Sequence, residues 1–199
     1  LYEYLAQQVL KQQPEDVQLF LLRSSLLDEF DAGWCEEVIG KALGIQADWY
    51  ALMDAVLRRN SFVLPIGDEG QYLRYHHLFQ DFLRERIQRE RPGEARQIMM
   101  RLAQVYTERQ EWERAYELYK ELDEPGEVVS LVERAGSTMI VHGQLLTLSE
   151  WLDSLPAELM AKHPALISLR GTVAVTRGDT REGIRLLDQA VSGMRANVD

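Results

Sequence analysis

One spacing pattern in the second half of the chain constrains the fold more than any other feature. Two sets of four small or apolar residues share the offsets 0, 3, 12 and 16. The first set is Ala103, Tyr106, Ala115 and Tyr119, and the second is Gly171, Ala174, Gly183 and Leu187. The sets lie 68 residues apart, twice the roughly 34-residue period of tetratricopeptide repeats, in which small residues let paired helices pack closely. The pattern therefore predicts stacked helical hairpins.

The repeat between these two sets follows the pattern less well. In the same register it carries Ser137, Ile140, Ser149 and Asp153. Gly143 still marks its internal turn, as Gly178 does in the last repeat, and Pro156 and Pro164 mark its end. A stack of such units is expected to form a right-handed superhelix with a concave face suited to binding.

The first half of the chain predicts a different arrangement, in which several helices precede one β-hairpin. Apolar residues recur at helical spacing over residues 2–10, and Pro14 suits the first turn of a second helix. Asp31 is placed to cap a third helix that ends near Gly44, and Asp48 is placed to cap a fourth.

The next segment, SFVLPIGDEGQYLRYH over residues 61–76, changes to the pattern of short strands. Its expected turn is GDEG at residues 67–70, and Pro65 indicates an edge strand because proline cannot donate a ladder hydrogen bond. A closing helix is expected from about Leu78 to Arg89. These elements together predict a winged-helix domain.

Pro92 and Gly93 are the expected boundary between the two arrangements. We assign residues 1–92 to a winged-helix domain and residues 93–199 to tetratricopeptide-like helical repeats, which makes a mainly α fold with one small β-hairpin. The chain begins with Leu1, inside an expected helix, rather than with methionine. We therefore expect it to be a segment of a longer protein.

The charge of the chain disfavours nucleic-acid binding. The net charge is −10, and residues 1–92 carry 15 acidic and 10 basic side chains. Six arginines form a local basic stretch, namely Arg84, Arg86, Arg89, Arg91, Arg96 and Arg101. Because Glu85, Glu90 and Glu94 interleave with them, we expect a solvated helical face, with a phosphate-binding track as the alternative.

The sequence contains no recognisable catalytic or metal-binding motif. Neither G-x-x-x-x-G-K-[ST] nor G-x-G-x-x-G occurs, and four histidines with one cysteine do not give zinc-ligand spacing. Cys35 has no neighbouring histidine and is expected to be a buried structural thiol, in keeping with a reducing cytoplasm. No apolar run is long enough to span a bilayer. We expect neither enzymatic activity nor a membrane partner.

His76 and His77, in QYLRYHHLFQDFLRER (residues 71–86), are the main candidates for chemistry. Adjacent histidines suit a metal site, a catalytic pair, a DNA-reading tip or a sensor of a bound ligand. On a helix, adjacent side chains diverge by about 100°, which disfavours a shared metal ion. His142 and His163 are expected to be turn or surface residues.

Several stretches resemble a known family. FLLRSSLLDEFDAGWCEEVIG (residues 20–40) and ALMDAVLRRNSFVLPIGDEGQYLRYHHLFQDFLRERI (residues 51–87) look like the region after the ATPase core in MalT-like regulators of the LuxR superfamily, which are bacterial signal-transduction ATPases. WLDSLPAELMAKHPALISLRG (residues 151–171) resembles the first helical repeats of the same proteins. RYHHLF and WLDSLP are the most specific parts of the resemblance.

The resemblance implies partners beyond this chain. Such regulators have an N-terminal nucleotide-binding domain, a winged helix, a helical superhelix that receives an inducer, and a C-terminal helix-turn-helix that binds DNA. It implies ATP or ADP as a cofactor of the longer protein, with none held by this segment. Contact with DNA is implied only through the C-terminal domain.

The resemblance also gives the two histidines a role. YHHLFQDFL (residues 75–83) is similar to the MHDLL stretch of related switch ATPases, such as plant resistance proteins and apoptosome scaffolds, in which the histidine reaches the phosphates of ADP and holds the closed state. By position His76 is the expected nucleotide sensor, and His77 takes the place of the aspartate. A histidine before a helix can donate an N–H to phosphate beside the free N–H groups of the helix. The alternative is that His76 caps the helix or packs under the wing.

Three aromatic residues expected to be exposed, Trp112, Tyr116 and Tyr119, are candidate contacts for an effector or partner, with core packing as the alternative. Two functions follow from these features. The first is a regulatory segment of an ATP-dependent, inducer-responsive transcriptional activator, in which the winged helix helps hold the nucleotide-bound resting state and the repeats bind an effector or partner. The second is a stand-alone helical-repeat adaptor for protein–protein interaction. Direct DNA binding through the winged helix is a third, which the acidic charge disfavours.

Overall fold

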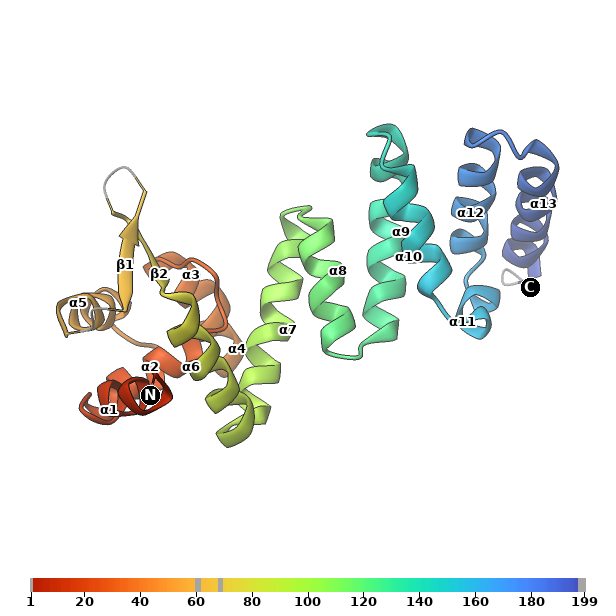
Figure 1. Ribbon diagram of the computed structural model, residues 1–199. Helices are drawn as coiled ribbons and strands as arrows, with labels where there is room; N and C mark the ends of the chain where they lie inside the picture. The colour runs from red at the N-terminus through yellow and green to blue at the C-terminus, as the bar shows by residue number, and fades with distance from the viewer. Residues whose placement is uncertain (1, 60–61, 68–69, 197–199) are drawn as a thin grey trace. The chain divides into compact units, whose positions relative to one another are not determined.

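The computed structural model describes residues 2–59, 62–67 and 70–196. The chain divides into two compact units, Leu1–Val105 and Tyr106–Asp199 (Figure 1). The described residues form helices and one two-stranded antiparallel sheet, which lies in the first unit. The fold class is therefore the predicted one, mainly α with a winged helix and its small hairpin followed by helical repeats.

The first unit begins with helices whose ends agree with the capping signals of the sequence. In chain order these elements are α1 (Tyr2–Lys11), α2 (Glu15–Ser24), α3 (Ala32–Trp34), the π-helical segment η1 (Cys35–Gly40), α4 (Lys41–Leu43) and α5 (Trp49–Arg59). Asp31 caps α3 by accepting a hydrogen bond from the backbone N–H of Trp34 at 2.7 Å. Asp48 accepts one from the N–H of Ala51 at 3.0 Å. Gly44, at a φ of 63°, ends the run from α3 to α4, as the sequence predicts.

The wing is a hairpin of β1 (Val63–Ile66) and β2 (Tyr72–Tyr75). The N–H of Gly70 donates to the carbonyl of Gly67 at 3.1 Å, which closes the predicted turn, whereas Asp68 and Glu69 lie outside the described residues. Phe30 bridges Leu73 in β2, so β1, with its proline, forms the outer strand as predicted.

The core of the first unit is aromatic and lies between the helices and the hairpin. The ring centroids of Phe20 and Phe30 are 5.9 Å apart, and those of Phe30 and Tyr75 are 5.2 Å apart. The Tyr75 hydroxyl bonds to Oγ of Ser24 at 2.6 Å, and burial raises the pKa of the tyrosine. Burial, together with the nearby Asp31 carboxylate, also raises the pKa of the Cys35 thiol, which is fully buried as predicted.

The wing leads into α6 (His77–Glu90), and α7 (Pro92–Glu108) follows at once, so Pro92 is the first residue of a helix. The compact first unit continues into α7 as far as Val105. Two ion pairs connect this part of α7 to α2 and to η1. Nε of Arg23 lies 2.8 Å from Oε2 of Glu94, and the Arg101 guanidinium bonds to the Glu37 carboxylate. The domain boundary at residue 92 stays a prediction.

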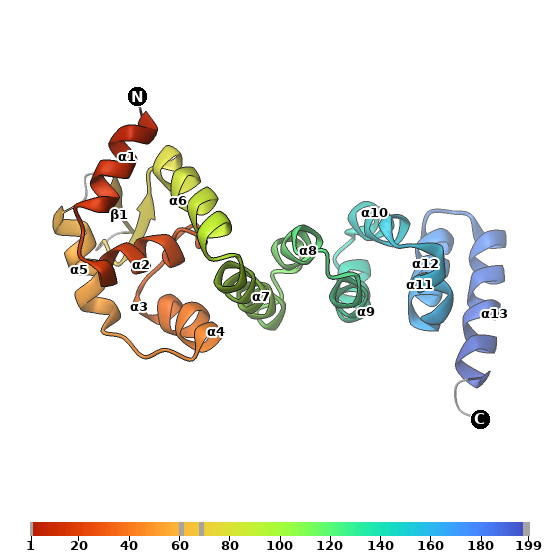
Figure 2. The ribbon, with the colours of Figure 1, turned by 90° about the horizontal axis from the view of Figure 1, so that it is seen from below.

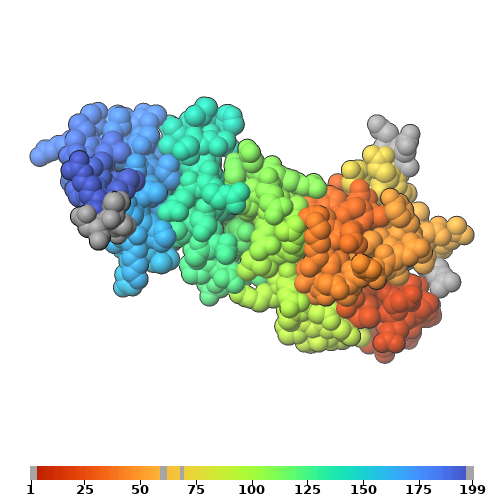
Figure 3. Space-filling model, turned by 180° about the vertical axis from the view of Figure 1, so that it is seen from behind, coloured from red at the N-terminus to blue at the C-terminus, as the bar shows by residue number. Residues whose placement is uncertain are grey.

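The second unit is a row of helices, most of which pack on a neighbour in chain order. After the end of α7 come α8 (Trp112–Glu121), α9 (Pro125–Val141), α10 (Leu145–Ser154), α11 (Ala157–Lys162), α12 (Pro164–Thr176) and α13 (Thr180–Ala196). Contacts join α8 to α9, α9 to α10 and α12, and α12 to α13. Figures 1 and 2 show α12 beside α13, and in the space-filling view of Figure 3 the colours from α9 to α13 succeed one another as adjacent layers.

The turn within each hairpin has the same geometry in all three repeats. Gln110, Gly143 and Gly178 adopt positive φ values of 61°, 74° and 95°. In each turn the next residue donates its N–H to the carbonyl five positions back, at 2.8, 2.8 and 2.9 Å. This is the Schellman arrangement, which satisfies the carbonyls that a helix end would otherwise leave unpaired.

The turns correct the register predicted for the middle repeat, which is wrong by one residue. The turn residue comes seven positions after Ala103 in the first repeat and seven after Gly171 in the last, and Gly143 comes seven after Gly136. The middle set is therefore Gly136, Met139, Leu148 and Leu152, all of them buried, rather than the half-exposed or exposed Ser137, Ile140, Ser149 and Asp153. The first set thus precedes the second by 33 residues and the second precedes the third by 35, with the short helix α11 in the longer interval.

Small residues let the paired helices of the last hairpin pack closely, as predicted. The backbones of α12 and α13 approach each other at Gly171 and Gly183. A Cβ atom on Gly183 would lie 2.9 Å from the carbonyl oxygen of Gly171 and 2.3 Å from Cγ2 of Val175. Because real Cβ atoms essentially never approach so closely, only glycine fits this crossing.

Candidate functional site

His76 and His77 lie side by side at the junction between the wing and α6. His76 is the N-cap of α6, with φ −60° and ψ 132°, and His77 is the first helical residue. The N–H of His76 donates to the carbonyl of Phe62 at 2.8 Å, and its own carbonyl accepts hydrogen bonds from Phe79 and Gln80 at 2.9 and 3.0 Å. The backbone around the pair is thus fixed by β1, β2 and the first turn of α6.

The rings of the pair face each other rather than diverge. Their centroids are 4.5 Å apart with an interplanar angle of 31°, and both side chains are exposed. The expected divergence of about 100° is wrong because His76 precedes the helix and does not have helical dihedrals. Among the described residues, no group of three or more His, Cys, Asp or Glu side chains is placed to hold a metal ion.

His76 occupies the N-cap position of α6, as in the alternative prediction, but it does not pack under the wing. Its side chain makes no capping hydrogen bond, and it is exposed. The N–H groups of His76 and Phe79 are already bonded, so the start of α6 presents those of His77 and Leu78 beside the two rings. The site can therefore offer imidazole and backbone N–H donors to an anion.

Five of the six arginines in the stretch after the pair form ion pairs with carboxylates, so the solvated-face interpretation describes them better than a phosphate track. Arg84 donates to the carbonyl of Ser25 at 2.7 Å and pairs with Asp28 at 3.0 Å. Arg91 pairs with Glu94 at 2.7 Å. Burial would raise the pKa of Glu94, but hydrogen bonds from Arg23 and Arg91 outweigh it, and the pKa is lowered.

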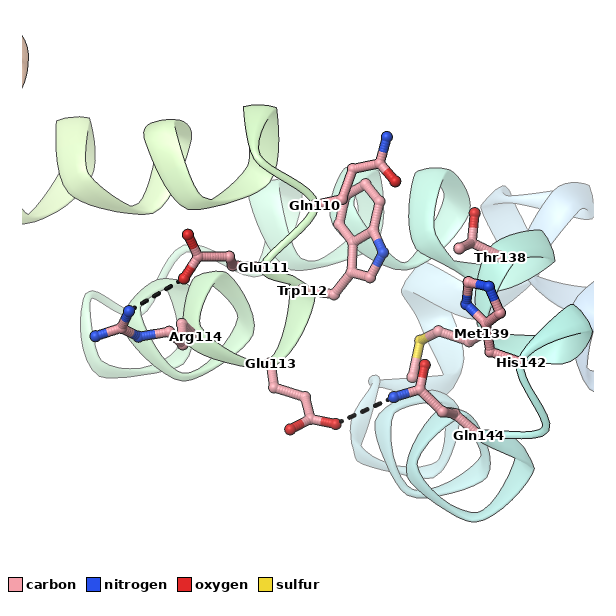
Figure 4. A pocket seen from close by; sticks show the side chains of 9 residues that line it. All are labelled: Gln110, Glu111, Trp112, Glu113, Arg114, Thr138, Met139, His142 and Gln144. Atoms are coloured by element: carbon pink, nitrogen blue, oxygen red, sulfur yellow. Dashed lines mark hydrogen bonds and ion pairs between the residues drawn. The ribbon is translucent and has the colours of Figure 1, made fainter.

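A second candidate site lies in the second unit, at the turns of the first two repeats (Figure 4). It is an open pocket of about 420 Å³. Its lining comprises Gln110, Glu111, Trp112, Glu113, Arg114, Thr138, Met139, His142 and Gln144. In Figure 4 the half-exposed Trp112 ring lies next to Gln110 and opposite Thr138 and His142 at the end of α9, whereas the Glu113 side chain extends away from the ring toward Gln144. This volume is within the range of small-molecule sites, which is about 300–1,000 Å³.

The expectation of exposed rings at Tyr116 and Tyr119 is wrong, because both are buried, each with 3% of its surface exposed. Tyr116 stacks on Trp151 with centroids 4.2 Å apart and an angle of 6°, and its hydroxyl bonds to Ser154 at 2.7 Å. Burial raises the pKa of Tyr119. Core packing therefore describes these two residues, and only Trp112 of the three lines the pocket.

The sequence analysis missed the pocket residues from the second repeat. Thr138, Met139 and His142 come from the last turn of α9, and Gln144 precedes α10. No sequence signal marks them, because Gln110 stands in the first turn where Gly143 stands in the second, and the two turns are seen to be equivalent only from their positive φ values. His142 is an exposed residue at the end of α9, as predicted, and the half-exposed His163 is the N-cap of α12, where Nδ1 lies 3.1 Å from Oε1 of Glu133.

No helix among the described residues combines the length and the hydropathy needed to cross a membrane.

Comparison with known sequences relates the whole chain to one group of proteins. The chain is 26% identical over 190 residues to the HTH-type transcriptional regulator MalT of Vibrio parahaemolyticus, covering 96% of this chain and 20% of that protein. It is 26% identical over 208 residues to MalT of Yersinia enterocolitica, covering 98% and 21%, and 25% identical over 199 residues to MalT of Cronobacter sakazakii, covering 100% and 22%. The chain thus spans about a fifth of the length of the curated relatives it matches.

The winged-helix unit also matches a defined domain family. Residues 6–95 fit the sequence profile described as the MalT winged helix domain. The matched range runs from α1 into the first turn of α7 and includes the hairpin and the histidine pair. Residues 6–95 match the MalT winged helix domain family, and the chain as a whole is similar to a segment of the MalT regulators.

Proposed function

We propose that this chain is a regulatory segment of an ATP-dependent, inducer-responsive bacterial transcriptional activator. The winged helix helps to hold the nucleotide-bound resting state of the longer protein, and the helical repeats bind an effector or partner that shifts it toward the active state. The relatives named as transcriptional regulators support this role, since they match the chain over both units.

The observation that carries the proposal is the exposed side chain of His76 at the start of α6. It makes no hydrogen bond that caps the helix, and it stands beside the His77 ring and the backbone N–H groups of His77 and Leu78. These donors suit the phosphate oxygens of ADP presented by a nucleotide-binding domain of the same protein. The phosphate-binding loop itself is absent from this sequence, so the 199-residue chain alone is expected to show no measurable ATP affinity.

The test is to replace His76 with alanine in the full-length protein that contains this chain. A charge-assisted hydrogen bond to phosphate contributes about 1.5–3 kcal/mol, so its loss should weaken ADP retention roughly tenfold or more. Destabilising the resting state should also raise transcription in the absence of inducer. ADP retained after gel filtration and a reporter gene without inducer give the two readouts.

Gln88→Ala is a matched control, because Gln88 is an exposed residue further along the same helix. It should change neither ADP retention nor basal transcription. If His76→Ala leaves both unchanged as well, the sensor role is wrong. A change in transcription without any change in ADP retention would also count against a contact with the nucleotide.

A further inference from the structure

We propose that the pocket beside Trp112 binds a cationic group, an ammonium or guanidinium, which the indole ring and the Glu113 carboxylate in its lining both favour. The inference rests on the proposed function in one respect, because it gives the chemical class of the effector or partner that the repeats receive. The binding site itself can be tested without any measurement of transcription.

The first element of the site is the Trp112 ring. It is half-exposed and lines the pocket, whereas Tyr116 and Trp151 are buried in their own stacked pair. The face of an indole carries the negative end of the ring quadrupole, and tryptophan binds cations best among the aromatic side chains. Trp112 is therefore a platform suited to a positive group.

The second element is the Glu113 carboxylate. In the described part of the chain it accepts one hydrogen bond, a long one of 3.5 Å from Nε2 of Gln144, and its side chain is exposed. It thus keeps acceptor capacity for a donor that enters the pocket. Thr138 and the exposed His142 add polar groups to the opposite wall.

The one cationic side chain in the lining of the pocket is already neutralised by its surroundings. Nη1 of Arg114 bonds to Oε2 of Glu111 at 3.0 Å, and its guanidinium carbon lies 4.4 Å from the centroid of the Tyr106 ring. Figure 4 shows Arg114 and Glu111 bonded to each other, apart from the Trp112 ring. Because Glu111 offsets Arg114, the remaining formal charge in the lining is that of Glu113, which favours a cation over an anion.

Arg114 and Tyr106 also give a precedent within the same turn for the proposed contact. The guanidinium there is held by an aromatic face and a carboxylate together, at 4.4 Å and 3.0 Å. The lining of the pocket contains the same two kinds of group, an aromatic ring in Trp112 and a carboxylate in Glu113. The source is either a small amine or guanidine compound or a Lys or Arg side chain of a polypeptide.

The experiment uses the 199-residue chain, with indole N–H signals read by NMR and the Trp112 signal assigned by its loss in Trp112→Phe. Butylammonium, methylguanidinium and two short peptides, one lysine-containing and one arginine-containing, serve as cationic probes, and butanol serves as the neutral counterpart of butylammonium. A saturable shift of the Trp112 signal with cations, and none with butanol, is expected. Tighter binding of the peptides than of the small cations assigns a polypeptide source, and the reverse assigns a small molecule.

Two variants distinguish binding of cations in the pocket from their non-specific attraction to an acidic protein. Glu113→Gln keeps the shape of the side chain and removes its charge, so cation binding should weaken roughly tenfold. Glu117→Gln removes an equal charge from an exposed residue one turn further along α8, outside the pocket, and should leave binding unchanged. Equal weakening by both variants, an equal response to butanol, or no shift with any probe would overturn the inference. If cations bind but do not alter transcription by the full-length protein, the site stands and the effector role fails.

Discussion

Replacing Gly183 with alanine tests the packing that makes the second unit a repeat stack. In an exposed position, glycine to alanine would stabilise a helix by up to about 1 kcal/mol, because alanine has the higher helix propensity. In α13 the new Cβ would instead lie 2.9 Å from the Gly171 carbonyl oxygen and 3.0 Å from the Val175 nitrogen. Both of these are backbone atoms, which cannot rotate away as a side chain does.

The expected magnitude follows from this geometry. Non-bonded carbon atoms prefer separations of about 3.5–4.0 Å, so relieving the clash requires α12 and α13 to separate by roughly 0.5 Å. A gap of that size forfeits about a quarter of the dispersion energy of the affected contacts. Overpacking typically costs about 1–3 kcal/mol. Gly183→Ala is therefore expected to lower the free energy of unfolding by about 1–2 kcal/mol after its gain in helix propensity.

Urea denaturation followed by circular dichroism gives the free energy, and amide hydrogen exchange in α12 and α13 shows whether the loss is local. Gly126→Ala is the control, since Gly126 is exposed in the first turn of α9 and a Cβ there would meet nothing within 4 Å. It should leave stability unchanged or raise it by about 0.5 kcal/mol. A Gly183→Ala protein as stable as the control would refute the close crossing of α12 and α13.

Three further predictions concern side chains whose partners the structure defines. Tyr116→Phe removes the hydrogen bond to Ser154 but keeps the ring stack, so we expect a loss of about 1 kcal/mol in urea unfolding. The pKa of Glu94 is lowered from its ordinary value of 4.5, so its contribution to stability is present above the unfolded-state pKa and is lost as the pH falls through the folded-state pKa. Glu94→Gln should therefore destabilise the chain at pH 7 and flatten the loss of stability as the pH falls below 4.5. Gln110→Gly should raise the melting temperature through a gain of about 0.5–1 kcal/mol, because Gln110 has a φ of 61°.

The fold was largely predictable because its signals are local. Asp31 and Asp48 cap the helices that the sequence assigns to them, and Gly44 ends the helical run before α5. The π-helical segment η1 was not foreseen, since no local pattern distinguishes it from an α-helix. There the Glu36 carboxylate accepts a hydrogen bond from the Trp49 indole at 2.6 Å, a contact between two helices that spacing alone cannot indicate.

The candidate sites were less predictable because they depend on which side of a helix faces its neighbour. Trp112, Tyr116 and Tyr119 are close in sequence and similar in chemistry, yet only Trp112 lines a pocket. A one-residue error in the register of the middle repeat would exchange buried and exposed positions. The displacement of 68 residues between the outer repeats concealed this error, because the intervals of 33 and 35 have the same sum as two equal periods.

The turn at Gln110 connects the repeat geometry with the pocket. Glycine occupies the equivalent position in the other two hairpins, where a positive φ is free of steric cost, whereas glutamine there costs about 1–2 kcal/mol. The strained residue is also one that lines the pocket beside Trp112. Strained backbone residues cluster at binding and active sites, and stability alone would favour glycine at this position. If Gln110→Gly stabilises the chain but weakens cation binding at Trp112, the strain serves the site; if binding is unchanged, Gln110 is only a tolerated substitute for glycine.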